Sequence, residues 1–180
     1  MRILPLGLML LLTACAATGP TPGFLHTVPK GTLLSLERPL PFKANSARVY
    51  LQNGKVYPRL AVVMGYGGAN RYQPYCTLEL QHISTSALTL SPRKFVIVAT
   101  NWDTTYEFFD KSMFRTRWRL SGGGSPQALY FACYRLGSES HDTAIRLNEV
   151  DSIVGDYFRL LPAEPPVQPA DTTAPAALHH

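Results

Sequence analysis

Three arginines stand at alternate positions in one stretch of the chain and could bind an anion. Arg115, Arg117 and Arg119 alternate with uncharged residues between Phe114 and Leu120. Because successive side chains of a strand point to opposite faces, a strand here would place the three guanidinium groups in one row, about 7 Å apart. Like charges in such a row repel one another unless acids on a neighbouring strand or an anionic partner offset them. We expect the row to be an interaction surface for an anionic partner; the alternative is a solvated face with acidic neighbours.

The segment before this row combines acidic and aromatic side chains. Residues 101–114 contain Asp103, Glu107 and Asp110 among Trp, Tyr and Phe, a composition similar to that of surfaces that handle carbohydrate. Two carboxylates can catalyse glycoside hydrolysis, but only at a separation that the sequence does not give. We expect a loop at 101–114 with Trp102 packed beneath it, and glycan binding or hydrolysis there is the alternative function.

Other residue types that could perform catalysis form no recognisable motif. The chain contains no GxSxG, SxxK or HExxH sequence. His82 and Ser84 would share one face of a strand, and His141 and Asp142 would lie in a loop, so a triad could be assembled only by chance proximity. Exposed polar residues are the simpler interpretation, and His179-His180 is expected to be incidental. We therefore expect no enzyme activity, no cofactor and no metal site.

The elements that must position these residues are mostly short strands. Runs with two-residue alternation, separated by turn residues, predict seven to nine strands. Asn53-Gly54 is typical of a tight hairpin, and the segment 39–41, Pro-Leu-Pro, should break a strand. One short helix near the C-terminal end would begin with Asn148 as its cap and end at Gly155. The expected fold is mainly β: an antiparallel sandwich or barrel-like domain with one short C-terminal helix. The strands are expected at 32–37, 47–52, 55–64, 75–81, 87–90, 93–100, 114–120, 127–136 and 157–160.

The composition limits the class of protein. The chain has 180 residues, 46% of them hydrophobic and only 16% charged, with a net charge of +5. That length suits one domain with its own core. The charged fraction lies below the roughly 25% of typical domains, which argues against a nucleic-acid scaffold. We expect no nucleic-acid partner.

The residues before the domain have the pattern of an export signal. Arg2 is followed by an apolar run from Ile3 to Leu12, which is too short for the about 20 residues that a membrane-spanning helix needs. The next residues, Leu12-Thr13-Ala14-Cys15, resemble the lipobox of bacterial lipoproteins. An ordinary secretory signal cut within Ala14-Cys15-Ala16 is the alternative.

This resemblance implies a modification and a location. In that family the cysteine, here Cys15, takes a diacylglycerol, the peptide before it is removed, and the new amine receives a fatty acid such as palmitate. Residues 1–14 would then be a signal peptide, and two or three acyl chains would anchor the protein stably. Ala16 stands where an Asp would favour retention in the inner membrane. The expected location is therefore the outer membrane, with the domain facing the periplasm.

The remaining two cysteines are expected to form a disulfide. With Cys15 assigned to lipid, Cys76 and Cys133 are an even pair in an oxidising compartment. Both alternate onto apolar strand faces, so we expect a bridge across the core. Closing this loop would contribute about 4 kcal/mol in the chain-entropy treatment. Free or metal-binding thiols are the alternative, and no CxxC supports it.

The arrangement of the domain is similar to that of small uncharacterised envelope lipoproteins of proteobacteria. The likeness covers residues 31–161 and rests on Gln73-Pro74-Tyr75-Cys76, Tyr130-Phe131-Ala132-Cys133 and Val154-Gly155-Asp156. It implies a fold and a location and no catalytic activity. Around the domain, the Pro/Gly/Thr-rich residues 15–30 should form a flexible tether and the Pro-rich residues 162–180 a disordered tail. The expected function is that of a non-enzymatic structural or interaction module of the envelope.

The lipid assignment predicts that Cys15→Ser releases the protein from membranes, because the acyl chains are the membrane attachment that the sequence predicts. Cell fractionation followed by a high-salt wash measures this. A variant that stays in the membrane fraction in high salt would contradict the lipid assignment.

Overall fold

The computed structural model describes residues 23–61, 67–108, 111–138 and 144–162, apart from the side chains of residues 107 and 108. The expected signal peptide 1–14, Cys15 and residues 163–180 of the expected tail lie outside these ranges. No helix in the described ranges is long and apolar enough to span a membrane.

Strands dominate the described part of the chain, as alternation predicts. The described ranges contain twelve strands rather than the expected seven to nine, and four of these (β7, β9, β10 and β11) have ten or more residues. The elements in chain order are η1 (Leu25–Thr27), β1 (Leu33–Leu36), β2 (Leu40–Phe42), β3 (Ser46–Gln52), β4 (Lys55–Tyr57), β5 (Leu60–Ala61), β6 (Ala69–Asn70), β7 (Tyr75–Ser84), β8 (Leu88–Leu90), β9 (Arg93–Phe108), β10 (Lys111–Ser121), β11 (Ala128–Gly137), α1 (Leu147–Val154), η2 (Gly155–Tyr157) and β12 (Phe158–Leu161).

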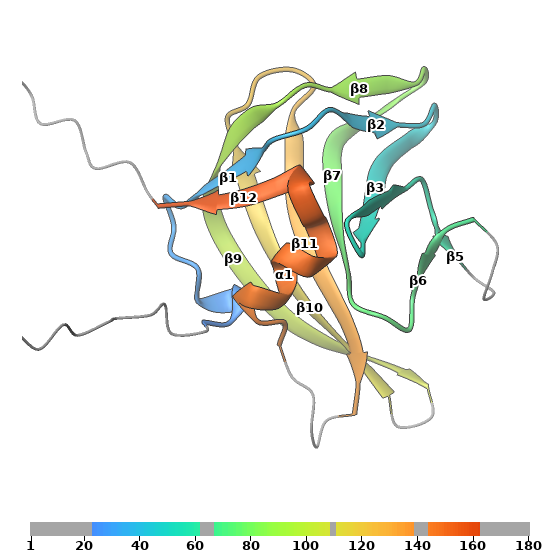
Figure 1. Ribbon diagram of the computed structural model, residues 1–180, viewed down its shortest axis with the longest axis vertical. Helices are drawn as coiled ribbons and strands as arrows, with labels where there is room; N and C mark the ends of the chain where they lie inside the picture. Colours follow the sequence, from blue (N-terminus) through green and yellow to red (C-terminus); the bar gives the residue numbers. More distant parts are fainter. Residues whose placement is uncertain (1–22, 62–66, 109–110, 139–143, 163–180) are drawn as a thin grey trace, which may run out of the picture.

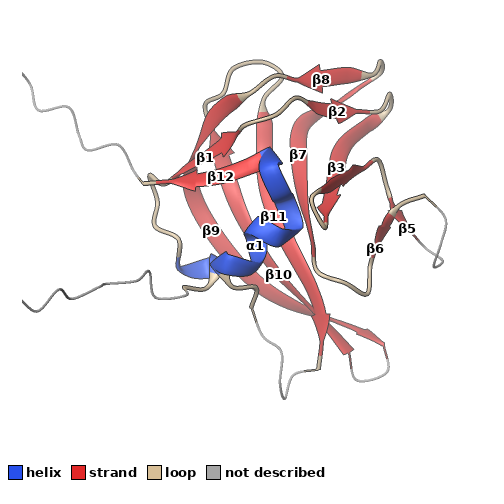
Figure 2. Ribbon diagram, in the orientation of Figure 1, coloured by secondary structure: helices blue, strands red, loops and turns tan. Residues whose placement is uncertain are grey.

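One large sheet forms the body of the fold. Its order is β12-β1-β9-β10-β11-β7-β3-β4, with every pair antiparallel. The sheet curls into a half-barrel, and α1 lies over its hollow side (Figures 1 and 2). Two small ribbons complete it: β2 with β8, and β5 with β6. The expected mainly β fold with one short C-terminal helix is confirmed, and its form is barrel-like.

The inner face of the half-barrel carries the core. Trp118, Phe131 and Phe158 are fully buried, and the Phe131 ring contacts the other two, with centroids 5.4 Å from Trp118 and 5.2 Å from Phe158. The indole Nε1–H of Trp118 donates a hydrogen bond to the carbonyl of Leu25 (3.1 Å). Leu25 is itself buried. Residues 23–30 therefore pack against the domain. The expected flexible tether at 15–30 is wrong for these residues.

The disulfide between Cys76 and Cys133 is confirmed, but it does not cross the core. The two residues stand directly opposite each other on β7 and β11. Their Cα atoms are 4.0 Å apart, near the spacing of about 4.5 Å for an antiparallel pair without hydrogen bonds. The bridge joins neighbouring strands because β7 and β11 are adjacent in the sheet, so both inward-pointing thiols lie on the same side of the core.

The segment 101–114 is a hairpin and not the expected loop. β9 continues through it to Phe108 and β10 starts at Lys111. Trp102 is about half exposed, so it does not pack beneath a loop. Sequence reasoning ended the strand at residue 100 because polar and charged residues follow. Pairing of these residues with β10 extends the strand in spite of their polarity.

The break expected at 39–41 is confirmed, because β1 ends at Leu36 before these residues. Sequence analysis did not predict that residues 40–42 form a new short strand, β2, in which Pro41 is tolerated because this ribbon has only two strands.

The prediction of the helix cap is wrong in detail. The helix begins after Arg146 rather than Asn148, since the Glu149 carboxylate accepts the backbone N–H of Arg146 (2.8 Å). Glu149 also pairs with Arg135 of β11, which ties α1 to the sheet. Burial acts to raise the pKa of Glu149, but these hydrogen bonds hold it below its ordinary value.

Two glycines close the gap between the sheet edge and α1. Asn53 and Gly54 both have positive φ (51° and 68°), which confirms the hairpin. The Gly54 N–H donates to the carbonyl of Ile153 (3.0 Å). Gly155, with φ 56°, ends α1 directly against Gly54, and a Cβ on Gly155 would lie 2.7 Å from the Gly54 Cα. A larger residue at Gly155 therefore requires movement of the backbone, whereas at Gly54 an added Cβ would lie at an ordinary 3.7 Å from the Gly155 Cα and only the positive φ opposes it.

Gly155→Ala should therefore lower the free energy of unfolding by more than Gly122→Ala, as measured by urea unfolding. Both glycines have positive φ, but Gly122 has no atom within 4 Å of an added Cβ. Backbone strain alone costs about 1–3 kcal/mol, and Gly155→Ala adds a steric clash. Equal losses in the two variants would contradict the close contact at this seam.

Candidate functional site

The three sequence-predicted arginines lie on the outer face of the sheet. On β10, Phe114, Thr116, Trp118 and Leu120 are buried, whereas Arg115, Arg117 and Arg119 are partly or fully exposed. The strand alternation expected for these residues is thus present, and the row faces away from the core.

The register of the sheet brings other charged and aromatic side chains beside this row. Asp103 and Tyr134 flank Arg115, and Tyr130 stands opposite Arg119. On the next strands, Tyr75 stands opposite Tyr134, and Glu79 stands opposite both Tyr130 and Arg48. We call this surface the arginine–tyrosine face; it consists of Arg48, Tyr50, Tyr75, Glu79, Asp103, Arg115, Arg117, Arg119, Tyr130 and Tyr134.

Two ion pairs neutralise part of this face. The Arg115 guanidinium binds both oxygens of the Asp103 carboxylate, with Nε–Oδ1 at 2.9 Å and Nη2–Oδ2 at 2.5 Å. This hydrogen bond raises the pKa of Arg115. Arg48 forms an ion pair with Glu79 at the other side, with Nη2–Oε1 at 2.7 Å. Arg115 therefore has the acidic neighbour that the alternative interpretation requires.

Arg117 and Arg119 carry the uncompensated charge between these pairs. Neither forms an ion pair with a described carboxylate. The Arg117 guanidinium stacks over the Tyr130 ring, 4.5 Å from its centroid, and Arg119 is exposed opposite the same tyrosine. The centre of the face therefore presents two cations and one phenol.

A ladder of tyrosines continues the face towards β3. The rings of Tyr75 and Tyr134 are stacked at 4.8 Å, and Tyr50 contacts Tyr75 at 6.0 Å. Burial raises the pKa of Tyr75, with smaller effects from Tyr134 and Tyr50, so its hydroxyl stays protonated at neutral pH. The ladder is rigid because stacked rings fill the surface between the strands.

Two buried polar atoms, one within the face and one beneath it, lack a hydrogen bond. They are the Nε of Arg117 and the hydroxyl of Thr77, and no described residue partners either of them. Both belong to one cross-strand line, because Ala132 stands opposite Arg117 on one side and Thr77 on the other. Unpaired buried polar groups are costly, and sites that bind a polar ligand are one place where they occur.

This arrangement is suited to binding an anion. Two of the four arginines are paired with Asp103 and Glu79, which leaves a net charge of +2 on the face. Planar guanidinium groups bind phosphate and carboxylate through two parallel hydrogen bonds. Tyrosine hydroxyls add neutral donors beside them. The geometry of these described residues is that of a recognition surface.

The sequence contains part of the evidence for the residues that surround the arginine row. Alternation in 47–52 and 127–136 places Arg48 with Tyr50, and Tyr130 with Tyr134, on the outer sides of their strands. Which strands lie side by side depends on the tertiary fold. Sequence reasoning therefore missed these residues as members of the site.

Among the remaining sequence candidates, those that the structure describes do not assemble into a second site. Asp103 is bound to Arg115, whereas the side chain of Glu107 and all of Asp110 lie outside the described residues. His141, Asp142 and His179-His180 also lie outside them. No three His, Cys, Asp or Glu side chains gather as metal ligands would within the described ranges.

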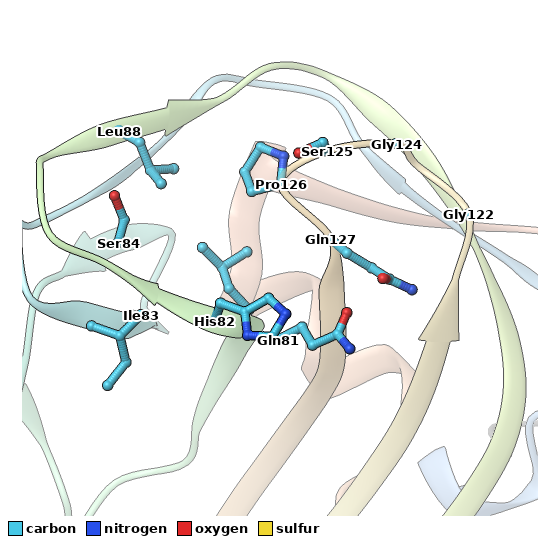
Figure 3. Close-up of a pocket in the computed structure, with 11 residues that line it drawn as sticks. Gln81, His82, Ile83, Ser84, Leu88, Gly122, Gly124, Ser125, Pro126 and Gln127 are labelled. Carbon is cyan, nitrogen blue, oxygen red and sulfur yellow. The ribbon is translucent and has the colours of Figure 1, made fainter.

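A pocket of about 660 Å³ lies at the other end of the sheet, between the end of β7 and the β10–β11 loop (Figure 3). His82 and Ser84 line it, but the Ser84 hydroxyl donates to the carbonyl of Ser86 (2.7 Å). In Figure 3, Ser84 lies near Leu88 and His82 beside Gln81, so the two side chains are apart. The pocket therefore contains no nucleophile activated by a base among its described residues.

The chain matches no protein-family model, and comparisons with curated proteins and with solved structures gave no match.

The face predicts a specific effect of Asp103→Asn. Loss of this carboxylate leaves Arg115 unpaired, so the variant should elute later from a cation-exchange column than Asp151→Asn does. Asp151 is exposed on α1, away from the face, and its variant has the same net charge. Because the pair is partly solvated, the unfolding free energy should fall by no more than about 1 kcal/mol. Equal elution of the two variants would show that Asp103 does not screen the face.

Proposed function

We propose that this protein is an outer-membrane lipoprotein, anchored by lipid on Cys15, that acts as a non-enzymatic interaction module of the cell envelope. Its arginine–tyrosine face binds an anionic component of the envelope that bears phosphate or carboxylate groups. The observation that carries this proposal is the pair Arg117 and Arg119, placed around Tyr130 with no described carboxylate bound to either.

The proposed location has two supports. Leu12-Thr13-Ala14-Cys15 has the residues of a lipobox directly after an apolar run. The Cys76–Cys133 disulfide is of the kind that persists in oxidising compartments such as the periplasm. An anchored domain with a basic face would meet anionic groups at high local concentration, since the membrane surface carries many of them.

An interaction module is favoured over a glycan hydrolase by the state of the carboxylates. The Asp103 oxygens are both occupied by Arg115, so Asp103 is placed to screen charge rather than to transfer protons. The rings of the face are held in stacks against guanidinium groups or one another. A pre-formed, rigid surface of this kind loses little side-chain freedom on binding.

The test compares two double variants of the full lipidated chain in cells treated with formaldehyde. Arg117→Gln with Arg119→Gln removes the central cations of the face. Arg38→Gln with Arg159→Gln is the matched control, because Arg38 also stacks on a tyrosine (Tyr157, 5.0 Å) and Arg159 is also exposed on a strand. The captured material is quantified for protein and for phosphorylated glycolipid.

The face variant should recover at least tenfold less of an anionic partner than the wild type, since each of the two lost charged hydrogen bonds costs about 1.5 kcal/mol or more. The control should recover the wild-type amount. In a parallel capture without formaldehyde, high salt should release the partner from the wild type. Recovery of the same partners by both variants would contradict a role for the face, and glycan arrays would then test the alternative at 101–114.

A further inference from the structure

We infer that one edge of the domain rests on the surface of a lipid bilayer; this inference depends on the lipid anchor proposed above. The edge lies where the described chain begins, and it combines η1, the start of α1 and the β9–β10 hairpin. We call it the aromatic edge; it consists of Phe24, His26, Trp102, Tyr106, Lys111 and Arg146.

Two large aromatic side chains of this edge are exposed. Trp102 is 49% and Tyr106 69% exposed, whereas Thr116 and Ser112, which stand opposite them on β10, are buried. Alternation places both rings on the same face of β9. The β9–β10 hairpin extends beyond the rest of the half-barrel (Figure 1). The face of β9 that carries Trp102 and Tyr106 is therefore not covered by the core and is exposed to solvent.

The start of the described chain packs against Trp102. The His26 ring lies 5.9 Å from the Trp102 ring and is stacked on Phe24 at 5.4 Å. The Arg146 guanidinium lies over Phe24, 5.9 Å from its centroid. The carbonyl of Gly23 accepts the N–H of Leu147 (2.9 Å), which fixes the chain at this place.

The residue types of this edge are those of a membrane–water interface. Trp and Tyr combine an apolar ring with a polar tip and are enriched at the headgroup level. Lys111 and Arg146 are exposed beside them and can bind lipid phosphates. The Asp103 carboxylate lies on the opposite face of β9, bound to Arg115. The described part of the edge is therefore aromatic and basic.

The length of chain between the proposed anchor and the domain favours lipid as the occupant. Cys15 precedes Gly23 by eight residues, which span at most about 29 Å when fully extended. A lipid on Cys15 would hold Gly23 within that distance of the headgroups. Because Gly23 is fixed beside Phe24 and Trp102, the aromatic edge is within reach of the bilayer.

Tryptophan fluorescence tests this inference selectively. The chain has two tryptophans, and Trp118 is fully buried in the core. The lipidated full-length protein is reconstituted into vesicles of phosphatidylethanolamine and phosphatidylglycerol whose acyl chains are either brominated or unmodified. Bromine should quench the emission of the wild type and leave that of Trp102→Phe unchanged. Tyr106→Ser should reduce the quenching, whereas Tyr72→Ser, which removes an exposed tyrosine elsewhere, should not.

Flotation of the vesicles separates the two proposals. If the protein floats but Trp102 is not quenched, the lipid anchor is supported and membrane contact by the aromatic edge is wrong. If the protein does not float, the lipid anchor is wrong, and the membrane contact that depends on it is wrong as well. If Trp102 is shielded from acrylamide in native membranes but accessible in the vesicles, the edge binds a protein and the inference is wrong.

Discussion

The register between β7 and β11 is the constraint on which the rest of the structure depends. Cys76 stands opposite Cys133, and the disulfide fixes this alignment covalently. Because side chains alternate with a period of two, a slip by one residue would move Leu78 and Phe131 out of the core. It would also move Tyr75 and Tyr134 from the outer face to the inner one. The core and the arginine–tyrosine face are thus two results of one alignment.

The alignment of β7 with β11 also places the small residues that lie beneath the arginine–tyrosine face. Ala132 and Thr77 stand opposite each other at its centre and are fully buried, even though they point away from the core. Larger neighbours cover them: Arg117 reaches over Tyr130, and Tyr134 stacks on Tyr75. Two ion pairs at the sides, Arg115 with Asp103 and Arg48 with Glu79, hold the remaining guanidinium groups. The charge that is left for a partner is concentrated at Arg117 and Arg119.

Alternation along the chain was enough to predict most of the strands and the arginine row, because both depend on which residues share a strand face. It missed β2 and the second half of β9. The disulfide followed from the even pair of cysteines, and alternation added only the face on which each lies. Alternation could not predict that Asp103 would pair with Arg115, since that contact depends on two strands being neighbours. Asn148 was taken as a helix cap by residue type, whereas Glu149 provides the cap from within the helix. Leu25 looked like part of a tether because Pro and Gly surround it, and a hydrogen bond from Trp118, far away in sequence, holds it. The errors therefore lie where distant segments meet.

Chemical footprinting of arginines in intact cells tests the central claim most directly. Phenylglyoxal modification is followed by mass spectrometry at Arg117 and Arg119. Arg38, which like Arg117 stacks on a tyrosine, and Arg159, which like Arg119 is exposed on a strand, are the internal standards. If the arginine–tyrosine face is occupied in the envelope, Arg117 and Arg119 react more slowly in cells than in the purified protein, while the two standards react equally in both. Equal reactivity of all four arginines in both settings would contradict an occupied face.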